Sequence, residues 1–396
     1  MKRSEIKVLH LITELPIGGA QDNTLLSVRG LKKLGYQVDL AAAPDGELES
    51  LAREYSDNVY HIKNFSANAI SPVKNIEAIL EICNLLKDNK YDIIHTHSST
   101  AGICGRIAAK ISKVPIIIHT VHGFPFHDFM KPLKKNFLIL LEKACANICD
   151  HMITVSNLNK EEIVERKIST IDKLTNVYSG IDLDKFNINK SKEEIKAELN
   201  IPEEDLVVGL IARMSNQKAP EYFIEAAKLI LKEKPNVTFL MVGDGPLKDK
   251  LIEQIGDETR IRMMGARKDI PEILKTLDIF ALSSIYEGLG RAMTEAMICK
   301  KPIVAPNVNG IPEVVIDGDT GFLVSPRDSK GLAEKILVLL NDEKLRNKMG
   351  LNAHHKVVPA FSDKKMVEDI DSLYRKILLN KLNINIETNK KEKVKV

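Results

Sequence analysis

The sequence lacks the features that mark several large classes of protein. It contains five cysteines among 396 residues, and none of them forms a C-x-x-C pair. This usage predicts reduced interior thiols in a cytoplasmic protein, with neither a disulfide framework nor a zinc site. No apolar stretch reaches the roughly 18 residues of a membrane-spanning helix. Residues 1–5 lead straight into a short strand, so no signal peptide is expected.

Bulk charge of one sign is also missing. The chain has 57 basic and 54 acidic residues, which leaves a net charge of only +3. That balance argues against a protein that binds nucleic acid through its overall charge, so no nucleic-acid partner is expected. With 396 residues, of which 44% are hydrophobic, the chain suits two cores rather than one. We therefore expect two domains of roughly 150 to 200 residues each.

Short apolar strand candidates alternate with helical stretches in both halves of the sequence. The pattern pauses over residues 176–182 and a charged stretch at 190–200, and then begins again. Parallel strands joined by helices are the economical interpretation. The sequence thus predicts an α/β fold with two doubly wound domains in tandem and a cleft between them. The predicted strands are 8–12, 38–42, 93–96, 116–120 and 152–155 in the first half, and 206–211, 238–242, 261–264, 279–282 and 303–305 in the second.

The end of the chain predicts one more helix. Met366, Ile370, Leu373 and Ile377 recur every three or four residues, so this helix has one apolar face to bury. The pattern alone leaves open which of the two domains it packs against. The residues after it are rich in lysine, and a disordered basic tail is expected there.

Two glutamates eight positions apart lie around a glycine loop. Glu287 and Glu295 follow the apolar run 279–282, and the residues from Arg291 onward are good helix formers. The loop therefore joins the carboxyl end of a strand to the start of a helix. In open α/β sheets ligands bind at such points, and the free N–H groups of the helix start favour a phosphate. Because carboxylates repel phosphate, the glutamates suit the hydroxyls of a ribose and a sugar; the alternative is two solvated surface side chains.

Two cations and a glycine turn accompany the glutamates in the second half. Arg213 ends a strand, and Lys218 follows five residues later near the start of the next helix. Such cations would clamp a diphosphate and stabilise the charge that appears as it departs, although surface charges at this spacing are common. Gly243 opens a tight turn, where a ligand or another loop can approach the backbone. The turn lacks both the third glycine of G-x-G-x-x-G and a Lys-Ser/Thr ending, which disfavours a dinucleotide or P-loop site.

Taken together, these motifs resemble the retaining glycosyltransferases of family 4. Each motif is common alone, but their order along nearly the whole chain is specific. In the second half the resemblance rests on Arg213 with Lys218, the turn 243–245, Glu287-x7-Glu295, Gly310-Ile311-Pro312-Glu313 and Thr320-Gly321-x-Leu323-Val324. In the first half it rests on Gly18-Gly19-Ala20, His95-Thr96-His97, His119-Thr120-Val121-His122-Gly123 and Val155-Ser156.

The resemblance implies the GT-B architecture, in which two Rossmann-like domains face a cleft and the last helix crosses back to the first domain. Residues 1–182 would form the acceptor-binding domain and residues 183–360 the nucleotide-sugar-binding domain. Residues 361–380 would form the crossover helix, and residues 381–396 the disordered tail.

The resemblance also implies roles for individual residues. Arg213 and Lys218 would hold the diphosphate, while Glu295 would bind the ribose and Glu287 the transferred sugar. Two departures bear on the shape of the sugar pocket: Leu289 stands where many members carry Phe, and Arg291 puts a charge where others have an apolar residue. The further expected contacts are the amides of Leu289 and Gly290 with the phosphate, Gly18, Gly19 and Gly243 with the donor, and His122 with the sugar.

The predicted activity is the retaining transfer of a hexose from a nucleotide-diphosphate sugar to a hydroxyl acceptor. The acceptor would be a lipid-linked or saccharide intermediate of cell-surface polysaccharide synthesis. The sequence does not distinguish uridine, guanosine and adenosine donors, and a UDP-sugar is the prediction; no other cofactor is expected. No residue of the donor domain is an obvious nucleophile, so the leaving phosphate itself would take the acceptor proton. The alternatives are a nucleotide-sugar epimerase of the same architecture, a silent binding protein, and a dinucleotide-dependent oxidoreductase, which would lack its glycine fingerprint.

No divalent metal is expected. The triplets Asp182-Leu183-Asp184 and Asp317-Gly318-Asp319 resemble a metal motif of other sugar transferases, but the resemblance assigns them to turns or linker. His95 and His97 lie along a strand end, and their rings are expected to point to opposite faces, which would make a poor chelate.

The acceptor side of the chain suggests contact with a membrane surface. Residues 124–137 mix aromatic side chains with three lysines before an apolar helix. Such a surface suits an anionic bilayer, where a lipid-linked acceptor would be found, and predicts peripheral attachment at the inner face of the cell membrane. The alternative is an ordinary loop with a solvated lysine face.

Overall fold

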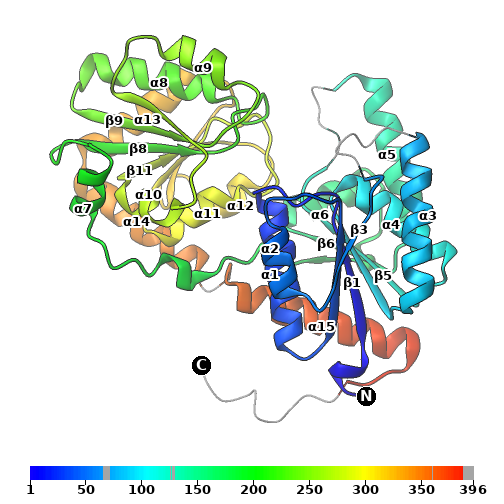
Figure 1. Ribbon diagram of the computed structural model, residues 1–396. Coiled ribbons are helices and arrows are strands. Elements are labelled where there is room, and N and C mark those ends of the chain that lie inside the picture. The colour runs from blue at the N-terminus through cyan, green and yellow to red at the C-terminus, as the bar shows by residue number, and fades with distance from the viewer. Residues whose placement is uncertain (66–71, 125, 127–129, 359, 387–396) are drawn as a thin grey trace. The chain divides into compact units, whose positions relative to one another are not determined.

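The protein divides into two compact units, each built on one parallel sheet. A computed structural model describes residues 1–65, 72–124, 126, 130–358 and 360–386. The first unit comprises residues 1–181 together with the chain from Asp363 onward, and the second comprises Asp182–Ser362 (Figure 1).

The first unit contains a seven-stranded sheet in the order β3-β2-β1-β4-β5-β6-β7. All of its pairings are parallel, and its central strands are almost completely buried, as expected for a sheet covered on both faces. The two edge strands, β3 and β7, have three residues each and were not among the predicted strands. The strands are β1 (Lys7–Leu11), β2 (Gln37–Ala42), β3 (Val59–His61), β4 (Ile93–His97), β5 (Ile116–Val121), β6 (His151–Thr154) and β7 (Leu174–Asn176).

Helices cover both faces of this first sheet and enclose two apolar cores. One core packs the sheet against α1 (Gly19–Lys33), α2 (Glu49–Tyr55) and α15 (Asp363–Leu382) (Figure 1). The other packs it against a second layer of helices. That layer consists of α3 (Pro72–Asn89), α4 (Ser99–Ile111), α5 (Pro132–Asn147) and α6 (Asn157–Glu165). Two short 3-10 helices lie at Arg3–Glu5 and Ile171–Lys173.

The last helix packs on the first unit, which decides the point that its periodicity left open. Met366, Ile370 and Leu373 are buried in the core that α1 also lines. Asp371 on the same face accepts hydrogen bonds from Arg3 Nε at 3.0 Å and from Arg3 Nη2 at 3.1 Å. The helix ends at Leu382, and Ile386 beyond it is still buried in the same core. The ordered chain therefore extends past residue 381, where the sequence predicted a tail; residues 387–396 lie outside the described part.

The second unit contains a six-stranded parallel sheet in the order β10-β9-β8-β11-β12-β13. The edge strand β13 was not predicted, and its first residue is Gly321, where a Cβ would lie 2.0 Å from the carbonyl oxygen of Ile303. The strands are β8 (Leu206–Ile211), β9 (Val237–Val242), β10 (Ile261–Gly265), β11 (Ile279–Ala281), β12 (Ile303–Pro306) and β13 (Gly321–Val324).

Two helical layers also sandwich the second sheet. One layer consists of α8 (Pro220–Glu233), α9 (Lys248–Ile255) and α13 (Ser329–Asn341). The other consists of α7 (Lys192–Glu198), α10 (Ile270–Thr276), α11 (Arg291–Ile298) and α14 (Glu343–Val357). The short α12 (Ile311–Val314) and a 3-10 helix at Leu183–Phe186 complete the unit.

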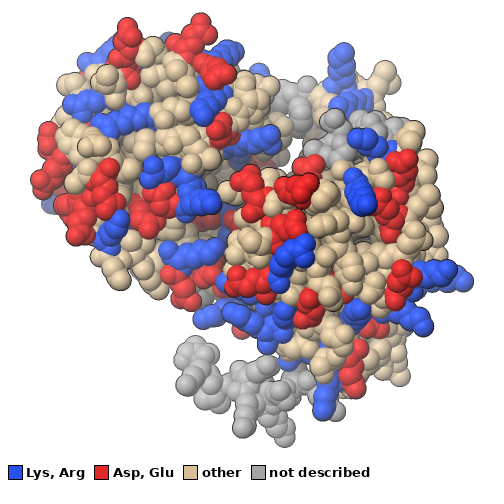
Figure 2. Space-filling view, viewed as in Figure 1, with Lys and Arg blue, Asp and Glu red and all other residues tan. Residues whose placement is uncertain are grey.

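Surface charge is mixed in sign. On the face that Figure 2 shows, acidic and basic side chains are interspersed over each unit. Within the described residues, no helix combines the length and the apolar composition that crossing a membrane requires.

Candidate active site

Loops that follow four neighbouring strands meet at one edge of the second sheet. The strands are β9, β8, β11 and β12, whose carboxyl ends share this edge because all of them run parallel. The loop after β8 contacts the loop after β11, where Ile285 N donates to Gln217 O at 2.8 Å. It also contacts the loop after β9, where Met214 N donates to Asp244 O at 3.0 Å. The predicted donor residues of the second half all lie in these loops or on α11.

Lys218 and Glu287 form an ion pair at this edge. The Glu287 side chain is only 5% exposed and that of Lys218 is 21% exposed, so solvent screens the pair weakly. Ser284 Oγ donates to the same carboxylate oxygen at 2.8 Å, and Glu287 N donates to Asn309 Oδ1 at 3.2 Å. The carboxylate is therefore oriented by Lys218 from the loop after β8 and by Ser284 from its own loop, while Asn309 from the loop after β12 bonds the backbone of Glu287.

Arg213 differs from Lys218 in having no side-chain partner among the described residues. It is exposed in the loop after β8, and no described residue forms a hydrogen bond or an ion pair with its side chain. A guanidinium presents a rigid fork of donors that matches a phosphate. The geometry of this side chain therefore suits an anionic ligand.

Glu295 pairs with Arg291 one turn earlier on α11. Arg291 Nε donates to Glu295 Oε1 at 3.0 Å, and both side chains are 16% exposed. This arrangement explains the unusual charge at position 291, because it neutralises the neighbouring glutamate. The i, i+4 spacing of Arg291 and Glu295 on a predicted helix is the sequence feature from which this pair could have been predicted.

The start of α11 offers backbone donors beside these side chains. Gly290 precedes the helix in the left-handed region, with φ of 84°, which favours glycine there. No described residue accepts a hydrogen bond from the N–H groups of Leu289 and Gly290. Such N–H groups, together with the helix dipole, favour an anion.

Gly243 allows the loop after β8 to pack closely against the turn after β9. Its φ is +134°, and a Cβ built at this position would lie 1.9 Å from the carbonyl oxygen of Ala212. Of the two possibilities that the sequence left open, a ligand or another loop, the structure shows the loop. Gly243 thereby lets the β9 turn lie against the segment that carries Arg213.

The first unit gathers its predicted residues at the equivalent edge of its own sheet. Gly18 and Gly19 start α1 after β1, and His122 directly follows β5. The loops after β1 and β4 are joined by Thr13 Oγ1 and Ser98 Oγ, which lie 2.7 Å apart. The carboxyl ends of β1, β4 and β5 are adjacent, so all three loops open at the same edge.

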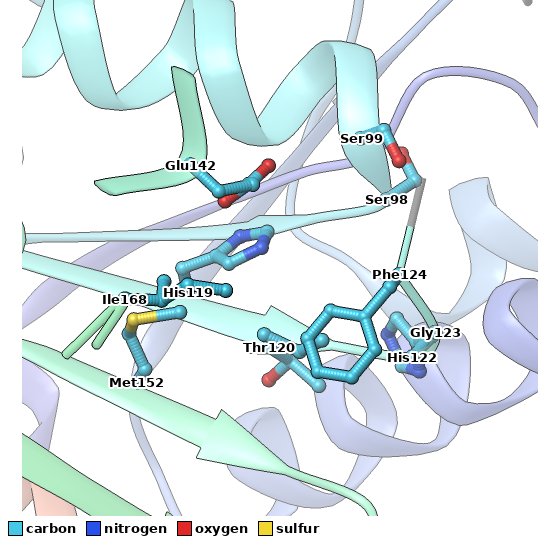
Figure 3. Close-up of a pocket in the computed structure, with 11 residues that line it drawn as sticks. Ser98, Ser99, His119, Thr120, His122, Gly123, Phe124, Glu142, Met152 and Ile168 are labelled. Atoms are coloured by element: carbon cyan, nitrogen blue, oxygen red, sulfur yellow. The ribbon is translucent and has the colours of Figure 1, made fainter. Parts of the chain in front are cut away.

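A pocket in the first unit includes His122. Figure 3 shows Ser98, His122 and Phe124 grouped at one end of it, and Glu142, Met152 and Ile168 at the other. Beneath it, Arg106 Nη2 donates to Glu142 Oε2 at 2.9 Å in a fully buried ion pair. Burial, followed by the Arg106 charge, holds the pKa of His119 well below its ordinary value. His119 is therefore a neutral wall of this pocket at neutral pH.

The expectation that His95 and His97 point to opposite faces is wrong. Their rings stack with centroids 4.4 Å apart and an interplanar angle of 28°. The reason is the two-residue period of a strand, which places residues i and i+2 on the same face. His10 on β1 joins them, and one ring nitrogen from each of the three lies within 4.8 Å of the others. His10 could not be predicted from the sequence, because only the pairing of β1 with β4 brings it to this position.

The D-x-D triplets have structural roles. Asp317 Oδ1 accepts from Leu323 N at 2.9 Å, and Asp319 Oδ1 accepts from Asn352 Nδ2 at 2.7 Å. Asp184 lies in the 3-10 helix Leu183–Phe186.

In the membrane-facing stretch predicted at 124–137, the rings of Phe124 and Phe126 stack with centroids 4.9 Å apart. Residues 125 and 127–129 of that stretch lie outside the described part of the chain.

Comparison with known proteins matches both halves of the chain. Residues 17–185 match the family described as Glycosyltransferase Family 4, and residues 191–356 match Glycosyl transferases group 1. An Escherichia coli protein named UDP-Gal:alpha-D-GlcNAc-diphosphoundecaprenol alpha-1,3-galactosyltransferase is 32% identical, over 96% of this chain and 99% of its own length. The capsular polysaccharide biosynthesis glycosyltransferase CapM of Staphylococcus aureus is 26% identical, over 94% of this chain and 97% of its own.

Solved structures share the fold. Anabaena Alr3699/HepE in complex with UDP-glucose superposes with a TM-score of 0.80 at 23% identity, covering 93% of this chain and 99% of that one. This likeness confirms the predicted GT-B fold class. The matches give no support to the epimerase alternative.

Proposed function

This chain belongs to the retaining glycosyltransferases of family 4, and we propose that it transfers a hexose from a UDP-sugar to a saccharide carried on a lipid diphosphate. The activities named for its relatives support this proposal. The E. coli relative uses UDP-Gal and a diphosphoundecaprenol-linked acceptor, and the S. aureus relative acts in capsular polysaccharide biosynthesis. The structural neighbour binds UDP-glucose.

The observation that carries the proposal is the Lys218–Glu287 pair beside Arg213, whose side chain has no partner in the described part of the chain. The loops after β8 and β11 thereby hold two cations and a buried carboxylate at one sheet edge. Arg213, Lys218 and the amides of Leu289 and Gly290 would bind the diphosphate. Glu287 would accept hydrogen bonds from the transferred sugar, and Glu295 from the ribose.

The two units would divide the substrates between them. The second unit would bind the nucleotide sugar, with Gly243 acting through the loop that carries Arg213. The first unit would bind the acceptor, with Gly18 and Gly19 approaching the donor. His122 would hydrogen-bond the transferred sugar.

The transfer would be a substitution on one face of the sugar. The bond between the anomeric carbon and the β-phosphate oxygen breaks, and the acceptor oxygen bonds to the same face of that carbon. The acceptor proton passes to the departing phosphate oxygen, so the products are the glycoside and UDP. Arg213 and Lys218 would stabilise the charge on the departing diphosphate, which is an electrostatic contribution that commonly accounts for the largest share of catalysis.

We propose that this reaction needs no divalent metal, since cationic side chains stand where a metal would neutralise the diphosphate. Transfer that continues at an unchanged rate in excess EDTA supports this. Loss of activity in EDTA with recovery on addition of Mn²⁺ contradicts it.

Product analysis tests the proposed activity directly. UDP-, GDP- and ADP-hexoses are each incubated with a synthetic GlcNAc-diphospho-polyprenol, and the anomeric configuration of the product is read by NMR. An α-linked product from an α-linked UDP-hexose is expected. A change of the donor sugar without any acceptor would indicate an epimerase, while binding of the nucleotide without turnover would indicate a silent protein.

We further propose that α5 contacts an anionic bilayer at the inner face of the membrane, where a lipid-linked acceptor resides. Leu133, Phe137 and Leu140 form one stripe of this helix and are 89%, 55% and 65% exposed. Lys131 and Lys134 are exposed in the same stretch. Apolar side chains flanked by lysines are typical of helices that lie in a membrane interface. A second exposed apolar stripe lies on α3, in the same helical layer, and consists of Val73, Ile76 and Leu80.

A further inference from the structure

A line of three imidazole rings runs from the interior of the first sheet to His122. His10 Nδ1 lies 2.9 Å from His97 Nε2, and His97 Nδ1 lies 3.0 Å from His122 Nε2. The rings of His97 and His122 stack with centroids 5.3 Å apart. Since His10 lies on β1 and His97 on β4, the line connects a fully buried side chain to the residue that we place at the transferred sugar.

The two inner rings of this line are uncharged at neutral pH. Burial lowers the pKa of His10 to about 3 and that of His97 well below its ordinary value, and the neighbouring histidines lower the pKa of His97 further. A neutral imidazole carries one N–H, so one of its nitrogens donates and the other accepts. All the hydrogen bonds along the line must therefore run in the same direction.

One unpartnered atom selects the direction. His10 Nε2 is buried and has no hydrogen-bond partner among the described residues. If the bonds ran inward from His122, this atom would be a buried N–H donor without an acceptor. If they run outward, it is only an unused lone pair. Because orphaned buried donors are rarer than under-satisfied acceptors, the outward direction is favoured.

From this geometry we infer that His97 and His10 are positioning residues that hold His122 as the tautomer protonated on Nδ1. His10 Nδ1–H donates to His97, and His97 Nδ1–H donates to His122 Nε2. His122 then carries its proton on Nδ1, which makes that nitrogen a hydrogen-bond donor. This inference rests on the proposed role of His122 in sugar transfer.

A metal site is the competing interpretation of the same cluster. His95 uses both ring nitrogens, since Nδ1 lies 2.7 Å from Tyr374 Oη and Nε2 lies 2.7 Å from Thr120 Oγ1. His97 also uses both, as described above. Among the ring nitrogens of these three histidines, only His10 Nε2 has no hydrogen-bond partner in the described residues and could bind a metal, whereas zinc takes at least three protein ligands. The hydrogen-bond pattern therefore favours the positioning role.

The tautomer can be read without any substrate. Long-range ¹H–¹⁵N correlation spectra of protein labelled with ¹⁵N-histidine distinguish a proton on Nδ1 from one on Nε2. We expect the Nδ1–H form for His122 in the wild type, and a mixture of the two forms in His97→Leu. A wild-type spectrum with the proton of His122 on Nε2 would overturn the inference, as would stoichiometric zinc in the purified protein.

Kinetics provide the second measurement. Replacing a partner that orients an active-site group commonly costs on the order of 10- to 100-fold. We expect a loss of that size in kcat for His97→Leu, with little change in KM for the donor. His97→Asn should recover part of the rate, because its amide N–H can still donate toward His122. Unchanged kcat in His97→Leu with an active wild type would contradict the inference, whereas an inactive wild type would contradict the proposed function.

A matched control separates positioning from a general effect of changing a buried histidine. His151 lies on β6 of the same sheet and bonds Thr175 Oγ1 through Nε2 at 2.8 Å, away from the line. His151→Leu should leave the His122 tautomer and kcat unchanged. Equal effects of His151→Leu and His97→Leu on both readouts would overturn the inference.

Discussion

Lys218 and Glu287 form an ion pair between the loop after β8 and the loop after β11. The two loops are also joined by hydrogen bonds, because Ile285 N donates to Gln217 O and Ser283 Oγ donates to Lys218 O at 2.9 Å. A phosphate that attracts Lys218 would weaken its hold on Glu287 and release the carboxylate toward sugar hydroxyls. In the proposed site, the pair would thus link diphosphate binding to sugar binding.

Glu287→Gln should abolish most of the turnover while leaving nucleotide binding intact. The amide keeps the shape of the side chain but loses the charge that pairs with Lys218 and holds the sugar. We expect a loss in kcat on the order of 10²- to 10³-fold, with a Kd for UDP within a few-fold of the wild type by calorimetry. Glu334→Gln, on the exposed face of α13, is the control and should behave as the wild type. An unchanged rate in Glu287→Gln would remove this residue from the site.

Arg213→Ala should weaken donor binding without destabilising the protein. The side chain is exposed and has no partner among the described residues, so its removal should change the free energy of unfolding by no more than about 0.5 kcal/mol. The loss of a phosphate contact should raise KM for the donor and lower kcat/KM by on the order of 10²-fold. Lys218→Ala should lower both activity and stability, because it leaves the buried carboxylate of Glu287 unpaired. Equal loss of stability in the two variants would contradict this difference.

The stripe on α5 predicts membrane binding that depends on three side chains. Changing Leu133, Phe137 and Leu140 to Ser should reduce co-sedimentation with phosphatidylglycerol-containing vesicles by roughly tenfold or more, because each exposed side chain loses apolar area that would enter the interface. Leu351→Ser, at an exposed position on α14 of the second unit, should have no effect. If the wild type itself fails to sediment with such vesicles at low salt, the proposed attachment is wrong.

Asp371 should be important for docking of the last helix. It accepts from both Arg3 nitrogens and from Tyr36 Oη at 2.8 Å, and the Arg3–Asp371 pair is buried. Asp371→Ala removes the carboxylate that pairs with the buried Arg3 charge, and breaking such a buried pair commonly costs about 3–5 kcal/mol. Asp369→Ala, two residues earlier, removes only an exposed pair with Lys365 and should cost less than about 0.5 kcal/mol. Urea unfolding of the two variants measures the difference, and equal losses would show that the buried pair has no special weight.

Acid should destabilise the first unit through its buried histidines. The pKa of His10 is lowered to about 3 by burial, and those of His95 and His97 are also lowered well below 6.5. In the unfolded chain these rings take up protons near their ordinary pKa, so the stability contributed by the neutral rings is complete above about pH 6.5 and falls as the pH drops toward 3. His10 alone should lower the free energy of unfolding at pH 5 by about 2 kcal/mol relative to its value at neutral pH. Urea unfolding from pH 8 to pH 5 should show this loss, with a shallower slope in His10→Gln; parallel slopes would contradict the assignment.

The sequence by itself determined the local elements and most of the candidate donor residues. Strands such as Leu206–Ile211 could be predicted because their apolar runs are continuous, and Arg213 and Lys218 could be placed because they follow directly after such a strand. Glu287 and Glu295 could be placed for the same reason, at the join of a strand and a helix. In each case the information lies within a few consecutive residues.

Only the tertiary structure decided which of these elements are neighbours. The order of the strands brings the loops of β8 and β11 together and forms the Lys218–Glu287 pair, and it places His10 beside His97. The apolar period of the last helix predicted its buried face but not the unit against which it packs. The buried core that it shares with α1 and the ion pair of Asp371 with Arg3 show that this is the first unit. The physical reason is that hydrophobic periodicity specifies which face of an element is buried, whereas strand pairing and helix docking depend on residues far apart in the chain.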